Sequence, residues 1–311
     1  MIRLHTAGRQ KPPRLLRLLA ESGSWLARTL AIEMVLPTAA GDIRFHCTNA
    51  QTLRRACTFF IKEEGTVAWL DRTLQPGDVF LDVGANVGIY TLYGAQRVGP
   101  SGRVFAVEPH LRNAVALMEN LQLNNFGGRV SLLTTALAER TRPAQFDYLE
   151  WRTGSSHSQL ADTAHAPAEA VQAAARASGI SELKVAQSVD SLLAEGALRP
   201  PNVVKIDVDG IELPILQGMR GLLTSAARPR SLQVECAPND GALIEAELVA
   251  CGYRLVQRHA TMAGNKQLTR AGGGRAGSGG SGGGRGGGGG AEAEAAAMLR
   301  IAHNAVFEPA A

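Results

Sequence analysis

The chain has 311 residues, 45% of them hydrophobic, and a formal net charge of +4 at pH 7. This length and apolar content suffice for a large buried core, in one domain or in one domain with appendages. The sequence has no run of the roughly 20 apolar residues that a membrane span needs. It also has no interior basic stripe with interleaved aromatic residues, so we expect neither a membrane span nor a nucleic-acid partner.

The N-terminal region is basic. Residues 14–30, RLLRLLAESGSWLARTL, have a helical periodicity that favours a helix docked through its Leu and Trp face. Together with a small strand pair that includes GDIRFHCT (41–48), this helix makes residues 1–65 a unit packed on the core. Because the segment is Arg-rich and poor in acids, an organelle-targeting peptide is the alternative. The four cysteines have neither CxxC nor zinc-like spacing, which is typical of reduced thiols in the cytoplasm.

Residues 66–311 are expected to form the main domain. From residue 78 onward, apolar strands alternate with helical stretches, which predicts an α/β fold with a largely parallel sheet covered by helices. The expected strands are 78–84, 103–109, 129–137, 202–210, 230–236, 253–258 and 303–309, and the expected helices are 86–98, 110–125, 212–225 and 240–251.

Two segments interrupt this alternation. Residues 138–181 are rich in Ala, Ser and Thr and are interpreted as an excursion before the fourth strand. Residues 271–290 are nearly all Gly, which predicts a flexible, disordered insertion in the hairpin of the last two strands. Such an insertion is tolerable because the entropy cost of closing a loop grows slowly with its length. An RNA-binding Gly/Arg segment is a weak alternative, since arginines are few here.

The first strand runs into the turn DVGANVG (82–88). Gly84 permits a tight turn, and Gly88 lets another backbone or a ligand approach closely. The spacing differs from the GxGxxG pattern of dinucleotide sites, and an acid before the turn suits a cationic ligand group better than a pyrophosphate. Glu108 ends the second strand, where an acid can bind both hydroxyls of a ribose. These features predict a ligand with a ribose and a positive charge, which S-adenosylmethionine fits.

The stretch VVKIDVDGIELPIL (203–216) is the second informative one. Lys205, Asp207 and Asp209 alternate, so they share one side if the strand persists. Ligands of open parallel sheets sit beyond the carboxyl ends of the strands. We therefore expect Asp82, Glu108 and Asp207 to converge there, where three acids are costly unless they bind something cationic.

These stretches carry a family resemblance. FLDVGANVGIYT, FAVEP, LNN, VDSLL and VVKIDVDGIELPILQGM resemble the FkbM-type S-adenosylmethionine-dependent methyltransferases, from about residue 41 to 260 and again at HNAVFEP (303–309). The chain departs from that family at Asp209, where a Glu is usual, and in the Gly-rich insertion. The resemblance implies a Rossmann-like class I fold, with a seven-stranded, mostly parallel sheet, an antiparallel last strand, and helices on both faces.

The resemblance also implies contacts with the cofactor S-adenosylmethionine. The methionine side of the cofactor would be lined by Asp82, Gly84, Ala85, Asn86 and Gly88. Glu108 would bind the ribose, and the adenine would lie near Ala136 and Leu137.

The expected reaction is methylation of a hydroxyl on a small molecule or saccharide by in-line transfer, with Asp207 as the general base or its orienting group. A ligand for the cofactor ammonium is the alternative role for Asp207. In the segment TGSSHSQL (153–160), Ser155, Ser156 and His157 are candidate acceptor contacts. No metal is expected, although acids at 207, 209 and 212 leave a magnesium or calcium site as an alternative.

Two other function classes stay open. An NAD-type oxidoreductase is disfavoured by the missing third glycine, and an inactive binding protein is disfavoured by the intact turn and strand-end acids.

Overall fold

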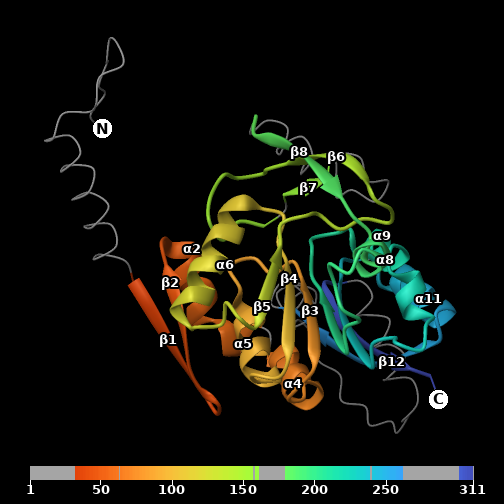
Figure 1. Ribbon diagram of the computed structural model, residues 1–311, viewed down its shortest axis with the longest axis horizontal. Coiled ribbons are helices and arrows are strands. Elements are labelled where there is room, and N and C mark those ends of the chain that lie inside the picture. Colours follow the sequence, from red (N-terminus) through yellow and green to blue (C-terminus); the bar gives the residue numbers. More distant parts are fainter. Residues whose placement is uncertain are drawn as a thin grey trace, which may run out of the picture.

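The computed structural model describes residues 32–62, 64–156, 158–160, 179–238, 240–261 and 301–310. The predicted helix within 14–30, the Gly-rich insertion 271–290 and His157 lie outside these residues. Within them, seven strands form a central sheet in the order β11-β12-β10-β9-β3-β4-β5 (Figure 1). In chain order they are β3 (Val79–Val83), β4 (Arg103–Val107), β5 (Val130–Leu133), β9 (Val203–Ile206), β10 (Ser231–Cys236), β11 (Tyr253–Ala260) and β12 (His303–Pro309).

The pairing directions identify the fold. Strand β3 runs parallel to β4 and β9, β4 is parallel to β5, and β9 is parallel to β10. Strand β12 is antiparallel to both β10 and β11. The chain therefore has the Rossmann-like class I methyltransferase sheet with an antiparallel last strand, as predicted, and each predicted strand is present.

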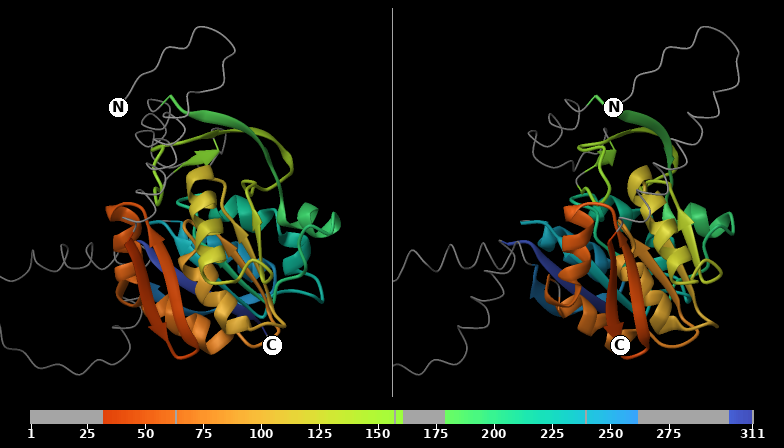
Figure 2. Two further views of the ribbon diagram at one scale, coloured as in Figure 1. Left: turned by 60° about the vertical axis from the view of Figure 1, so that its left-hand side comes forward. Right: turned by 90° about the vertical axis from the view of Figure 1, so that its left-hand side faces the viewer.

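Helices cover both faces of the sheet (Figure 2). Strand residues alternate between two cores because successive side chains of a strand point to opposite faces. Phe80, Val104 and Val203 pack against one set of helices, and Leu81, Phe105 and Val204 pack against the other. The first set is α4 (Glu64–Thr73), α5 (Ile89–Val98) and α6 (Leu111–Leu123), and the second is α8 (Val189–Ala194), α9 (Glu212–Gln217), α10 (Arg220–Leu223) and α11 (Gly241–Ala250).

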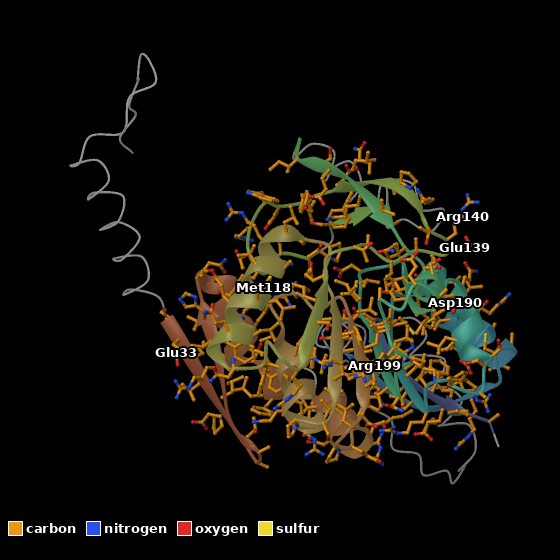
Figure 3. The ribbon with its side chains drawn as sticks, in the orientation of Figure 1. Glu33, Met118, Glu139, Arg140, Asp190 and Arg199 are labelled. Atoms are coloured by element: carbon orange, nitrogen blue, oxygen red, sulfur yellow. The ribbon has the colours of Figure 1, made fainter. Side chains whose placement is uncertain are left out.

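The N-terminal elements pack against this domain. Strands β1 (Ile32–Thr38) and β2 (Gly41–Cys47) form an antiparallel pair, followed by α2 (Ala50–Cys57) and α3 (Phe59–Lys62). Backbone N–H groups of Arg44 and His46 donate to the amide oxygens of Asn124 and Asn120, each at 2.8 Å. The pair is thus fixed beside α6, on whose outer side Met118 lies (Figure 3).

The segment predicted as an excursion, 138–181, contributes two strands to a second sheet, which the sequence analysis missed, and the third strand begins at the end of the segment. Strands β6 (Arg142–Asp147), β7 (Gln159–Leu160) and β8 (Ser181–Ala186) pair antiparallel in the order β7-β6-β8. They lie beyond one end of the central sheet, at the top of Figure 1. Phe146, Tyr148 and Leu160 form a small core there with alanines of the same region.

Two sequence expectations about thiols and membranes concern the whole chain. Each of the four cysteine thiols is free, with Cys57 exposed and the others buried. In the part of the chain that the structure describes, every helix is too short or too polar to cross a bilayer.

Candidate active site

The turn after β3 alternates three residues in the left-handed backbone region. Gly84, Asn86 and Gly88 have φ values of +81°, +51° and +92°. Glycine adopts such angles freely, and asparagine does so more readily than most residues. The N–H groups of Gly84 and Ala85 both donate to the carbonyl of Val107 at 3.0 Å, which ties the turn to β4.

Close packing is a second reason why both positions of the turn need glycine. A Cβ at Gly84 would overlap the backbone carbonyl oxygen of Asp207, and a Cβ at Gly88 would overlap Cδ1 of Leu117. The sequence analysis explained Gly88 by the close approach of another backbone or a ligand. The structure adds that both positions must lack a side chain so that β9 and α6 can pack against the turn.

Glu108 lies on one side of this turn, buried with 5% of its surface exposed. Its Oε2 accepts a hydrogen bond from the N–H of Asn86 at 2.6 Å, and its Oε1 accepts one from the N–H of His110 at 2.8 Å. Burial raises the pKa of Glu108 to about 7, although the two N–H donors pull it down. Both oxygens therefore already bind donors of the chain itself.

Residues 150–156, which we call the strap, cover this region. The side-chain amides of Asn86 and Asn113 each donate to the carbonyl of Ser155 at 3.0 Å. The N–H of Gly154 donates to Oδ1 of Asn113 at 2.7 Å. From α2, Arg55 donates to the carbonyl of Gly154 at 3.0 Å and to Oγ of Ser156 at 2.7 Å.

His110, the residue before α6, anchors the strap. It is 2% exposed, and its Nε2 lies 3.0 Å from the carbonyl of Glu150 and 3.1 Å from Oγ of Ser155. The ring stacks on Trp151 with centroids 5.9 Å apart. Burial lowers the pKa of His110, so the ring is neutral near pH 7. Ser155 and Ser156 thus contact the surroundings of Glu108. We call this region, from Glu108 to the strap, the Glu108 side.

Ala136 and Leu137 follow β5 and are buried, 2% and 3% exposed. The carbonyl of Ala136 accepts from the N–H of Gln187 at 2.9 Å, and the N–H of Ala138 donates to the carbonyl of Gln187 at 2.9 Å. These residues link the small sheet to the end of β5.

The opposite side of the turn holds a cluster of mixed charge. Nζ of Lys205, which is 1% exposed, lies 2.7 Å from Oδ2 of Asp207 and 4.0 Å from Oδ1 of Asp82. The ammonium also lies 4.7 Å from the centroid of the Tyr90 ring. Thr91 donates to Oδ2 of Asp82 at 2.6 Å. Burial raises the pKa of Asp82, and the charge of Lys205 opposes that shift.

Glu235 joins this cluster and was not predicted. It lies on β10, next to Asp207, and the two carboxyl groups hydrogen-bond. The negative charge of Asp207, followed by burial, raises the pKa of Glu235 well above its ordinary value. An acid near the carboxyl end of a buried strand is the same signal that marked Glu108. We call Asp82, Lys205, Asp207 and Glu235 the Asp207 side.

The turn after β9 is shaped by Glu212. Asp209 and Gly210 have φ values of +62° and +109°, and Oε1 of Glu212 accepts from the N–H groups of Val208 at 3.2 Å and Gly210 at 3.1 Å. Burial raises the pKa of Glu212 to about 7. Across the described ranges, no group of three or more His, Cys, Asp or Glu side chains is arranged to hold a metal ion.

The structure thus brings two of the three expected acids together. Lys205 joins Asp82 and Asp207, whereas Glu108 bonds a separate set of donors across the turn. Sequence reasoning did not identify Glu235, Arg55 and Asn113, whose contacts depend on pairing between distant segments.

Comparisons with known proteins agree with this fold. A family model described as the methyltransferase FkbM domain matches residues 82–255, more than half of the chain. The hexuronic acid methyltransferase AglP of Haloferax volcanii is 27% identical over 163 residues, which cover 52% of this chain and 59% of that relative.

Solved structures are more distant. Fibrillarin of Aeropyrum pernix has a TM-score of 0.43 at 9% identity and covers 88% of this chain and 82% of its own. An S-adenosylmethionine-dependent O-methyltransferase of Thermotoga maritima has a TM-score of 0.38 at 12% identity, over 89% of this chain and 78% of its own. TM-scores below 0.5 carry no argument about function. The family model, in contrast, matches more than half of the chain, so the chain belongs to the FkbM-domain methyltransferase family.

Proposed function

We propose that the protein transfers a methyl group from S-adenosylmethionine to a hydroxyl of a small molecule or saccharide. The observation that supports this most is the Asp207 side, beside the Gly84–Gly88 turn, where Asp82 and Asp207 share the ammonium of Lys205 and Glu235 contacts Asp207. Oδ1 of Asp82 is buried and accepts no hydrogen bond from any described residue. This donor set fits a cofactor that carries an ammonium and a sulfonium.

The proposed cofactor contacts are those that the family resemblance implies. We propose that Asp82, the turn residues Gly84, Ala85, Asn86 and Gly88, and Asp207 lie along the methionine portion. Glu108 would bind the ribose, and Ala136 and Leu137 would border the adenine. When bound, the cofactor supplies an electrophilic methyl group on a cationic sulfur.

The residues of the chain would then position the acceptor and remove its proton. Alignment of the reacting atoms is worth roughly 7–11 kcal/mol in favourable intramolecular reactions. A positioned base adds typically 10²–10⁴-fold for a hydroxyl acceptor. Asp207 is suited to that role because its side chain is 27% exposed while Lys205 holds it in place.

A saccharide acceptor is supported by the relative named as a hexuronic acid methyltransferase. That relative is matched over 59% of its length, so its acceptor enters here as a proposal. The other candidate acceptors are hydroxyls of small molecules, from which the partly exposed Asp207 could remove a proton in the same way.

The test combines binding and transfer. Calorimetry with S-adenosylmethionine should show binding, and label from the methyl group should appear on neutral sugars, uronic acids or small alcohols. Stability of the product to mild alkali separates a methyl ether from a methyl ester. Asp207→Asn should lower turnover at least 10-fold, whereas Asp42→Asn, an exposed residue of β2, should not. No binding and no transfer would overturn the proposal and would favour an inactive member of the family.

A further inference from the structure

Asp207 and Glu235 come from neighbouring strands that run parallel. Val234 of β10 is in register with Ile206 of β9, so each acid directly follows a paired residue. Both acids share the sheet face of Lys205, because alternate residues of a strand point the same way. Their carboxyl groups hydrogen-bond, and both remain partly accessible.

We infer that Asp207 and Glu235 act as one proton-accepting pair for a neutral acceptor hydroxyl, with Glu235 setting the basicity of Asp207. This inference rests on the proposed methyl transfer. It assigns to Glu235 a positioning role that acts through its contact with Asp207.

Two carboxyl groups in contact cannot both ionise without repulsion. A hydrogen bond between carboxyl groups needs one proton, so the pair keeps that proton to a higher pH than an isolated carboxyl group. The apparent pKa values then belong to the pair and not to either residue. A base is most effective when its pKa lies near the working pH, and the pair achieves this with acids that would otherwise be too weak as bases.

Charged and polar groups surround the pair on neighbouring elements. The negative charges of Asp209 and Glu212 add to that of Asp207 in raising the pKa of Glu235. On the far side, Asn304 of β12 is in register with Glu235, and His259 of β11 is in register with Asn304. Lys205 is the cation next to Asp207, and its ammonium also faces Asp82.

An independent observation points to a cationic ligand beside the pair. Oδ1 of the fully buried Asp82 accepts no hydrogen bond from any described residue, and its nearest cation is the shared Lys205 at 4.0 Å. A buried carboxylate oxygen without a hydrogen bond fits a site at which a cationic methyl donor binds.

The acceptor oxygen forms a bond to the methyl carbon while the carbon–sulfur bond breaks and its electron pair stays on sulfur. The hydroxyl proton moves to the ionised pair, which returns to its singly protonated form and later releases that proton to water. An acceptor carboxylate needs no such base and would add another negative charge, so this arrangement favours a neutral hydroxyl.

The experiment uses Glu235→Gln with Glu139→Gln as the matched control, an exposed residue at the edge of the molecule (Figure 3). For the native chain, log kcat/KM should rise with pH and level off at the pKa of the pair. In Glu235→Gln the rising limb should move at least one pH unit lower, and kcat should fall about 10–100-fold. The affinity for S-adenosylmethionine should change less than about threefold.

A second readout needs no methyl transfer. In the free protein, ¹³C NMR of side-chain carboxyl groups should show Glu235 titrating well above the ordinary glutamate range. Asp207→Asn should return Glu235 toward that range, which also keeps the inference testable if Glu235→Gln does not fold. The inference would be overturned if both acids titrated in their ordinary ranges, or if the rising limb of the pH profile kept its position in Glu235→Gln. Normal proton sharing without any methyl transfer would instead overturn the proposed function.

Discussion

The carboxylate of Glu108 is held by neutral N–H donors, whereas the carboxylate of Asp207, across the same turn, is held by an ammonium and a second carboxyl group. Neutral donors fix a group in one position and leave its charge unopposed. Mixed charges make the protonation of each group depend on its neighbours. The Glu108 side is therefore suited to holding a ligand, and the Asp207 side is suited to moving a proton.

The Glu108 side and the Asp207 side also differ in how far other residues cover them. The strap lies over the Glu108 side through hydrogen bonds to Asn86, Asn113 and Arg55. Asp207 keeps 27% of its side chain exposed. A covered binding side next to an open reacting side is what a transferase needs if one ligand is a cofactor and the other is a variable acceptor.

The largest expected effect concerns the residue that joins the two sides. Gly84→Ala would place a Cβ on the carbonyl oxygen of Asp207 and force an alanine into the left-handed region. The backbone cost is about 1–2 kcal/mol, and moving β9 adds about 1–3 kcal/mol. We expect urea unfolding to show a loss of about 2–5 kcal/mol.

Gly88→Ala is the matched control, because its φ is also positive but its Cβ meets the end of the Leu117 side chain. A side-chain end can shift where a backbone cannot, so the loss should be about half that of Gly84→Ala. Equal losses would mean that contact between the turn and β9 does not set the cost.

The next prediction compares two buried glutamates, Glu108 and Glu212, by the pH dependence of the unfolding free energy. The folded pKa of Glu108, about 7, lies above its ordinary value of 4.5. Its contribution to stability is therefore complete below pH 4.5 and is lost as the pH rises through 7. Glu108→Gln removes this titration. Between pH 4.5 and 7, the unfolding free energy of the variant should therefore fall less than that of the native chain. The difference should amount to about 3 kcal/mol.

Glu212→Gln provides the comparison near the Asp207 side, since burial raises the pKa of Glu212 to about 7 as well. Urea unfolding at several pH values should give both variants flatter profiles than the native chain. Parallel profiles for Glu108→Gln and the native chain would show that Glu108 is ionised when folded.

The central sheet could be predicted because its strands are continuous apolar runs with clear turns between them. The second sheet could not, for a physical reason. On β8, Leu183 and Val185 are 80% and 56% exposed. Because these apolar residues face outward, the alternation of apolar and polar residues does not reveal which side of β8 is buried. Strand β6 places Phe146 in a small core among alanines, whose pattern gives no amphipathic signal.

The sequence singled out Asp82, Glu108 and Asp207 as candidate site residues because each lies at or next to the carboxyl end of a strand. Glu235 has the same position in β10 as Asp82 has in β3, one residue before the end of the strand, so this position alone did not lead to Glu235. Its contact with Asp207 depends on the register of β9 and β10, which periodicity does not give. The strap depends on contacts between α2 and residues about 100 positions later.

The smallest effect concerns Asp209, where the chain departs from its family. Its φ of +62° costs least for short polar side chains that bond locally, as at Asn86 on the Glu108 side. Asp209→Asn should therefore change the unfolding free energy by less than about 0.5 kcal/mol, while Asp209→Glu should cost about 1 kcal/mol. Because the charge of Asp209 helps to raise the pKa of Glu235, Asp209→Asn should also move the rising limb of the pH–rate profile slightly lower, and Asp209→Glu should leave it in place. Thermal unfolding and the pH profile of kcat/KM check both. If Asp209→Glu proves as stable as the native chain, backbone strain does not explain the aspartate, and its charge beside the pair is the remaining reason.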